Sequence, residues 1–175
     1  MAKAEAKTEA KTAARVREPR AVYRVVPVGA GHTLRALFDV NVLIALLDAD
    51  HIHHRRASAW LAEHIAAGWA SCAITQNGCV RIMSQPGYPN PLPTAQVAHR
   101  LAEAVSTRHH LFVPSSASLL DPEIFDTGQL LGHRQVTDAW LLGLAVMHGL
   151  RLVSFDGALP LRAVRGATAA HVVVI

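Results

Sequence analysis

The chain has 175 residues, about half of them apolar, which is enough to bury one substantial core and argues for a single domain. No apolar run approaches the roughly 18 residues that a membrane-spanning helix needs, and the first twenty residues lack the apolar stretch of a secretory signal. The sequence therefore predicts a soluble, cytoplasmic protein that does not enter a membrane. Its two cysteines, Cys72 and Cys79, are expected in the core rather than in a disulfide.

Positive charge is concentrated at the start of the chain. The formal net charge is +4, and residues 1–20 hold six basic and three acidic side chains, a net +3. The protein's only lysines are Lys3, Lys7 and Lys11. Residues 34–175 therefore have no lysine, which counts against phosphate-loop nucleotide hydrolases and phospho-receiver domains, because both need a lysine amine.

Residues 1–33 are expected to form a basic extension outside the folded domain. Residues 1–20 favour helix but have no apolar face to bury, so a frayed helix or a disordered arm is predicted. Two roles stay open for it, a solubilising tail and an arm that touches nucleic acid. A short strand is expected at residues 21–28, and Gly29-Ala30-Gly31 is too incomplete to indicate a dinucleotide-binding loop.

From Leu34 onward, short β-rich apolar runs alternate with helical patterns, which is typical of a parallel sheet covered by helices. The predicted strands are residues 34–38, 69–74, 110–113, 152–155 and 171–175. The predicted helices are residues 41–47, 54–67, 75–84, 94–107, 119–129 and 135–148. Thr75 is the expected cap of the third helix, and four prolines make residues 85–93 a loop.

Three aspartates occur at positions where an open α/β sheet binds its ligands, beyond the carboxyl ends of strands. Asp39 and Asp156 each follow a predicted strand, and Asp138 lies near the start of an apolar helix. Three carboxylates held close together repel one another unless a cation neutralises them. Because all the ligands are oxygens, the pattern favours Mg²⁺ or Mn²⁺ over zinc. Taken singly, the same residues read equally well as helix and turn caps.

The sequence also resembles a known family. Residues 39–48 (DVNVLIALLD), 132–139 (GHRQVTDA) and 154–156 (SFD) are similar, in this order, to the motifs of VapC-type toxins, which are PIN-domain ribonucleases. The resemblance covers about residues 34–161. It implies a PIN-like, three-layer α/β/α domain over residues 34–175, with a central, mostly parallel sheet of four to five strands.

The resemblance further implies an Mg²⁺- or Mn²⁺-dependent endoribonuclease toxin that cuts RNA and is neutralised by a cognate antitoxin. Family members are commonly homodimers, within higher toxin–antitoxin assemblies in some cases. Asp39, Asp138 and Asp156 match the metal-binding acids of the family, and Thr137 and Ser154 match its small polar neighbours. The antitoxin is expected in an apolar groove beside the site, with Trp60 and Ile65 as candidate contacts.

One position departs from the family pattern. Where relatives usually have glutamate after the second strand, this chain has Gln76 in Thr75-Gln76-Asn77-Gly78. A glutamine can hydrogen-bond water or ligand, but it removes one negative charge that would help to hold a metal ion. The catalytic set is therefore expected to be Asp39, Asp138, Asp156 and Gln76, with weakened activity. The alternative is a catalytically impaired PIN domain that binds RNA or an antitoxin.

Other polar residues support weaker predictions. His133 and Arg134 precede the helix of Asp138, and either a phosphate contact or a structural role, as a loop salt bridge or a backbone clamp, fits them. Asn41 either contacts a metal-bound water or caps the helix that follows. Adjacent histidines at positions 51, 53 and 54 indicate solvated side chains more than a metal cluster. An aspartate-nucleophile phosphatase also starts with an acid after its first strand, but it needs a second aspartate where Asn41 stands.

Overall fold

The computed structural model describes residues 34–175, so the predictions for residues 1–33 lie outside the described part. The chain forms a five-stranded sheet in the order β3-β2-β1-β4-β5, and every neighbouring pair is parallel. The strands are β1 (Ala36–Phe38), β2 (Trp69–Cys72), β3 (His110–Val113), β4 (Arg151–Ser154) and β5 (Val172–Val174). The α-helices are α1 (Val40–Leu47), α2 (His54–His64), α3 (Ala73–Met83), α4 (Thr94–Val105) and α5 (Val136–Met147).

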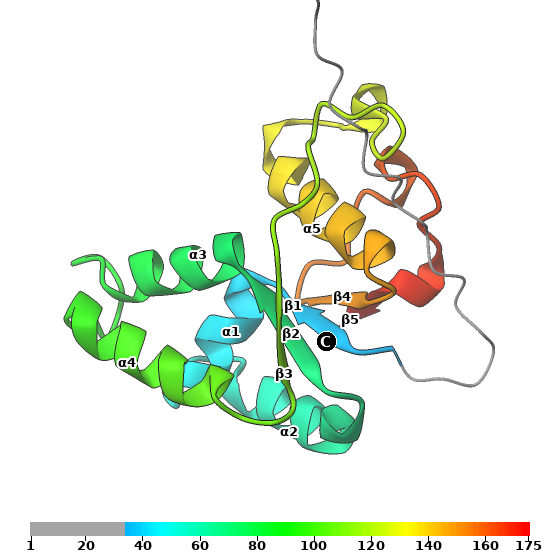
Figure 1. Cartoon of the computed structure of the whole chain (residues 1–175). Coiled ribbons are helices and arrows are strands. Elements are labelled where there is room, and N and C mark those ends of the chain that lie inside the picture. Colours follow the sequence, from blue (N-terminus) through cyan, green and yellow to red (C-terminus); the bar gives the residue numbers. More distant parts are fainter. Residues whose placement is uncertain (1–33) are drawn as a thin grey trace, which may run out of the picture.

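Helices cover both faces of the sheet, which confirms the predicted three-layer α/β/α domain (Figure 1). Because successive strand residues point to opposite faces, Leu37 and Leu152 pack under α5 whereas Phe38 and Val153 pack under α1 to α4. Phe38 is fully buried and stacks on the ring of Trp69 at 5.5 Å. The two apolar clusters hold the carboxyl ends of β1 and β4 side by side.

Turn chemistry explains the one predicted helix that does not form, residues 119–129. The segment consists of turns and ends in a single 3-10 turn, η2 (Thr127–Gln129). The Asp121 carboxylate accepts a hydrogen bond from the backbone N–H of Glu123, and the Ser118 hydroxyl accepts one from Leu120. Such local bonds compete with helix formation, so the sequence-based prediction was wrong here.

The start of α3 also differs from the prediction. The helix begins at Ala73 with Cys72 as its cap, so Thr75 is the third helical residue rather than the cap. The Thr75 hydroxyl accepts from the Cys72 N–H at 3.0 Å and donates to the Cys72 carbonyl at 3.1 Å. This side-chain link ends β2 two residues earlier than expected and places Gln76 within the first turns of α3.

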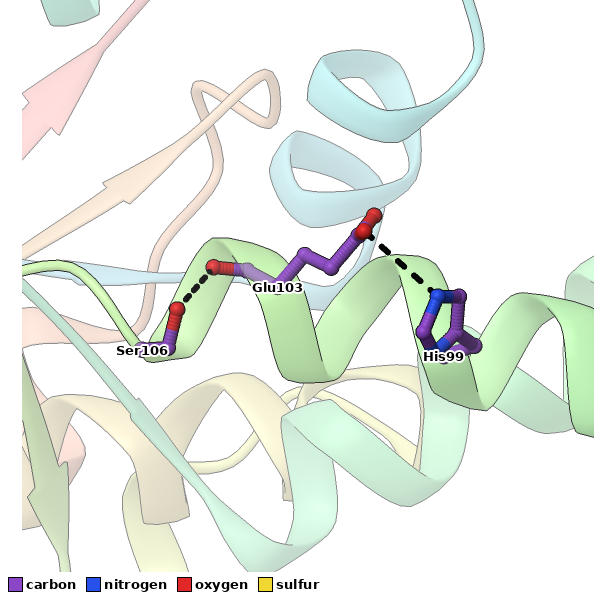
Figure 2. A network of polar contacts seen from close by, with 3 residues as sticks. All are labelled: His99, Glu103 and Ser106. Atoms are coloured by element: carbon purple, nitrogen blue, oxygen red, sulfur yellow. Dashed lines mark hydrogen bonds and ion pairs between the residues drawn. The ribbon is translucent and has the colours of Figure 1, made fainter.

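Charge pairing contributes little to this fold. The single salt bridge within residues 34–175 joins His99 to Glu103 across 3.4 Å on the exposed side of α4 (Figure 2). An exposed pair of this kind adds little stability, so the fold rests on its apolar clusters. None of the helices in the described range is long and apolar enough to cross a membrane.

Candidate functional site

Asp39 follows the last residue of β1 and begins α1. Its carboxylate accepts a hydrogen bond from the Val40 N–H, and its Oδ2 atom accepts another from the Ser154 hydroxyl at 3.0 Å. The side chain is only 8% exposed. Asp39 therefore caps α1, as the structural reading of this residue predicted, and its carboxylate also lies at the carboxyl edge of the sheet.

Asp156 and Asp138 approach the same edge from β4 and α5. The Asp156 N–H donates to the Ser154 hydroxyl oxygen at 3.1 Å, so Ser154 connects the loop of Asp156 to Asp39. The Asp156 side chain is exposed and accepts from the Ala158 N–H at 2.8 Å. Asp138 lies in the first turn of α5 and is half-buried.

Two of the three carboxylates, Asp39 and Asp138, hold a proton more tightly than an ordinary aspartate does. Burial raises the pKa of Asp39 above its ordinary value, and the charge of Asp156 adds to this despite the hydrogen bonds from Ser154 and Val40. The pKa of Asp138 is raised to about 6, mainly by burial and further by the negative charges of Asp39 and Asp156. The sheet thus brings together the three acids that the sequence singled out, at a cost in electrostatic repulsion.

A divalent cation fits the chemistry of this group of acids. All three donors are carboxylate oxygens, the ligand type that Mg²⁺ and Mn²⁺ prefer, and a cation would offset their mutual repulsion. Within the described range, no three acidic, histidine or cysteine side chains stand ready to hold a metal ion. A metal ion would therefore bind there only if the carboxylate side chains change conformation, or if water molecules supply the remaining ligands.

A hollow of about 480 Å³ opens beside Asp39. It is lined from α1, α3 and α5, and Asn41 and Thr137 from the predicted set belong to it. Its lining residues are Asp39, Val40, Asn41, Ile74, Asn77, Gly78, Arg81, Ile82 and Thr137.

Two residues of the hollow, Asn77 and Arg81, were missed by the sequence analysis. They are four residues apart, so they lie on one face of α3 and point the same way. Arg81 is exposed and forms no salt bridge within residues 34–175. The sequence pattern that could have predicted them is their i, i+4 spacing on α3, the helix that follows β2.

Gln76 faces away from this hollow. Its side-chain amide donates to the Ser71 hydroxyl on β2 at 2.9 Å, and that hydroxyl lies 2.8 Å from the Nε2 atom of His110 on β3. Each helical residue is rotated by about 100° from the next, so Gln76 and Asn77 cannot share a direction. The structure therefore separates Gln76 from the residues that line the hollow beside Asp39.

The remaining predicted residues are distributed around the site. Ser154 bonds directly to Asp39, as described above. His133 and Arg134 form part of η3 (His133–Gln135), are exposed, and line a separate shallow depression before α5. Neither residue forms a salt bridge in the described part of the chain, which removes the loop-salt-bridge reading.

An apolar groove of about 530 Å³ runs between α2 and α4, and its position differs from the expected one. Ile65 lines the groove, but Trp60 does not. Trp60 stacks on His64 at 4.2 Å and meets the edge of Phe38 instead. The groove also includes Trp69, the first residue of β2. It therefore lies toward the amino-terminal ends of the strands, whereas the acids lie at the carboxyl-terminal ends.

Comparison with known proteins agrees with this arrangement. The PIN domain model matches residues 36–165. Ribonuclease VapC44 of Mycobacterium tuberculosis is 52% identical over 142 residues, which is 81% of this chain and 100% of the relative. Ribonuclease VapC38 of the same organism is 40% identical over 122 residues, which is 69% of this chain and 84% of the relative.

Two solved structures share the fold. The crystal structure of Mycobacterium tuberculosis VapC20, described as a sarcin-ricin loop cleaving toxin, has a TM-score of 0.51 at 13% identity and covers 70% of this chain and 91% of its own. VapBC2 from Rickettsia felis, bound to a DNA fragment from their promoter, has a TM-score of 0.50 at 14% identity and covers 70% and 89%. At these identities the likeness concerns the fold alone.

Proposed function

The chain belongs to the VapC-type PIN-domain ribonucleases, and from this premise we propose that it is a divalent-metal-dependent endoribonuclease toxin. The observation that carries the proposal is the meeting of Asp39, Asp138 and Asp156 at the carboxyl edge of the parallel sheet, with Ser154 bonded to Asp39. We further propose that the protein acts in the cytoplasm, where its RNA substrate occurs.

The three acids supply negative charge at fixed positions. The bound Mg²⁺ or Mn²⁺ would lower the pKa of water and offset the charge that develops on the phosphate. Ser154 holds the Asp39 carboxylate in place, and the α1 backbone amide holds its other side. Asp156, exposed beside them, is the acid best placed to meet solvent and substrate.

Arg81 and Asn77 are proposed to position the RNA backbone. The Arg81 guanidinium has no carboxylate partner in the described part of the chain, and it lines the same hollow as Asp39. A guanidinium binds phosphate oxygens through charge-assisted hydrogen bonds. Asn41 and Thr137 add neutral donors in the same hollow. His133 and Arg134, exposed before α5, are proposed to contact phosphates further along the strand.

A cognate antitoxin is proposed to bind the apolar groove between α2 and α4. A groove lined mainly by leucine, alanine and isoleucine side chains accepts the apolar face of a partner helix. Because the groove and the three acids lie at opposite ends of the strands, an antitoxin segment that inhibits cleavage must extend beyond the groove to reach the acids. We also propose a homodimer, with higher toxin–antitoxin assemblies built on it.

The purified chain is expected to cut RNA only with Mn²⁺ or Mg²⁺, and more rapidly as the pH rises through about 6. Asp138 gives up its proton in that interval, and only the ionised carboxylate attracts the cation. Gel analysis of RNA over a pH series, with and without a chelator, measures both effects. Equal cleavage in the chelator, or a rate that falls as the pH passes 6, would contradict the proposal.

Replacing Gln76 by glutamate is expected to raise the rate of manganese-dependent cleavage. The added carboxylate need not enter the hollow, because the Coulomb attraction between a carboxylate and a divalent cation acts without direct contact. Gln76→Ala, which also removes the bond to Ser71 but adds no charge, is the control and should show no rise. A rate that is unchanged in Gln76→Glu would remove any role for charge at this position.

The alternative proposal is a catalytically impaired PIN domain that binds RNA or an antitoxin. The observation that favours it is the neutral amide of Gln76, committed to Ser71 on β2. RNA binding without cleavage in either metal, at every pH tested, would support this alternative over the active enzyme.

A further inference from the structure

Three partly exposed rings gather beside the acid site. His51 and His53 lie in the turn between α1 and α2, and Phe155 lies between β4 and Asp156. The centroids of the His53 and Phe155 rings are 4.5 Å apart, and those of His51 and Phe155 are 6.5 Å apart and stacked. We call these three residues the aromatic patch. Ile52, between the two histidines, is 87% exposed.

The aromatic patch is next to the acids in sequence and in the fold. Phe155 directly precedes Asp156, whose backbone N–H is tied to the Ser154 hydroxyl, and that hydroxyl donates to Asp39. β1 lies between β2 and β4 in the sheet. Along the carboxyl edge, therefore, α3 with Arg81 lies on one side of Asp39, and Phe155 with Asp156 lies on the other.

The histidine rings are not explained by ion pairing. The salt bridge on α4 is the single one found in residues 34–175, and it involves neither ring. Asp48, the acid whose charge acts on His51, already accepts from the Tyr88 hydroxyl at 2.6 Å and from the Asp50 N–H at 3.1 Å. His53 stands before α2 without making a capping hydrogen bond, so its side chain is not required by the helix.

We propose that the aromatic patch binds an unpaired RNA base next to the bond that the acids cut. Histidine and phenylalanine rings stack on nucleobases, and every base has a face for such stacking. A strand whose phosphate lies between Arg81 and the acids would bring its neighbouring base over Phe155 and His53. The inference rests on the proposed function, since it assigns a base-binding position to that same site.

His53 is the residue to change, because Phe155 also packs against the core whereas the ring of His53 makes no hydrogen bond to any other part of residues 34–175. In a chelator, which keeps the RNA uncut, we expect His53→Ala to weaken binding of a short fluorescent oligoadenylate about tenfold by anisotropy. His53→Phe, which keeps a stacking ring, is expected to bind as the unchanged protein does. His99→Ala, which removes an exposed histidine from α4, is the matched control and should have no effect (Figure 2).

A second probe separates stacking from contact with the backbone. The tenfold loss should vanish on an oligoribonucleotide whose bases have been removed, because only sugar and phosphate then remain. Unchanged oligoadenylate binding in His53→Ala, or His53→Phe as weak as His53→Ala, overturns the inference. If the unchanged protein binds oligoadenylate but cuts no RNA in manganese, the proposed catalytic function fails, while the comparison of His53 variants still decides the aromatic patch.

Discussion

Asp39→Asn is expected to lower the rate of RNA cleavage by at least about 100-fold, comparable with the loss of one electrostatic contact to a reacting group. The substitution keeps the size of the side chain and an oxygen that accepts the Val40 N–H. It removes the negative charge that lies deepest in the group of three acids. A rate assay in saturating Mn²⁺ measures the loss.

The same variant should not lose stability. Burial raises the pKa of Asp39, which means that the ionised carboxylate costs folding free energy at neutral pH. This cost is absent at low pH, where the carboxyl is protonated in both the folded and the unfolded chain, grows as the pH rises from the ordinary pKa to the raised pKa, and is complete above the raised pKa. A neutral amide avoids it, so Asp39→Asn in a chelator should melt at or above the temperature of the unchanged protein at pH 7.

Asp126→Asn is the matched control for this substitution. Asp126 precedes η2, and its side chain makes no capping hydrogen bond. It should leave both rate and melting temperature unchanged. If Asp39→Asn retains full activity, the acid group is not the catalytic site that we propose. If the variant unfolds in the chelator, the ionised carboxylate stabilises the fold and the stability argument is wrong.

Phe38→Ala is expected to reduce the free energy of unfolding by about 3–5 kcal/mol, the usual loss for a buried phenylalanine. Phe38 is 0% exposed, stacks on Trp69 at 5.5 Å and meets Trp60 edge-on at 6.1 Å. Its removal leaves a cavity under α1 and α2 that the two rigid tryptophan side chains cannot easily fill. Denaturant unfolding followed by circular dichroism measures the change.

Phe112→Ala provides a comparison within the same sheet. Phe112 lies on the edge strand β3 and is 49% exposed, so its loss should cost no more than about 1 kcal/mol. Equal destabilisation by the two substitutions would show that the cluster under α1 to α4 does not dominate the stability. Because Phe38 directly precedes Asp39, we also expect Phe38→Ala to impair cleavage.

Much of the fold follows from local patterns in the sequence. Alternation of apolar strands with helical repeats predicted five strands, and all five form within a few residues of their expected bounds. Gly68 and Gly149, with φ angles of 80° and 62°, end their helices as expected, since glycine adopts this backbone region at little cost. Helix 119–129 failed because local side-chain bonds at Ser118 and Asp121 outweighed its propensity.

The sequence by itself determined the sheet and its helical layers, because the alternation of apolar strands with helical repeats is a local property, and it singled out three aspartates as candidates for the site. Only the tertiary structure decided which side chains share the site. The start of α3 at Ala73 sets the direction of every residue after it, so Asn77 and Arg81 face Asp39 while Gln76 turns to Ser71. The contact of Phe155 with His53 likewise joins segments about a hundred residues apart, through packing that no local pattern encodes.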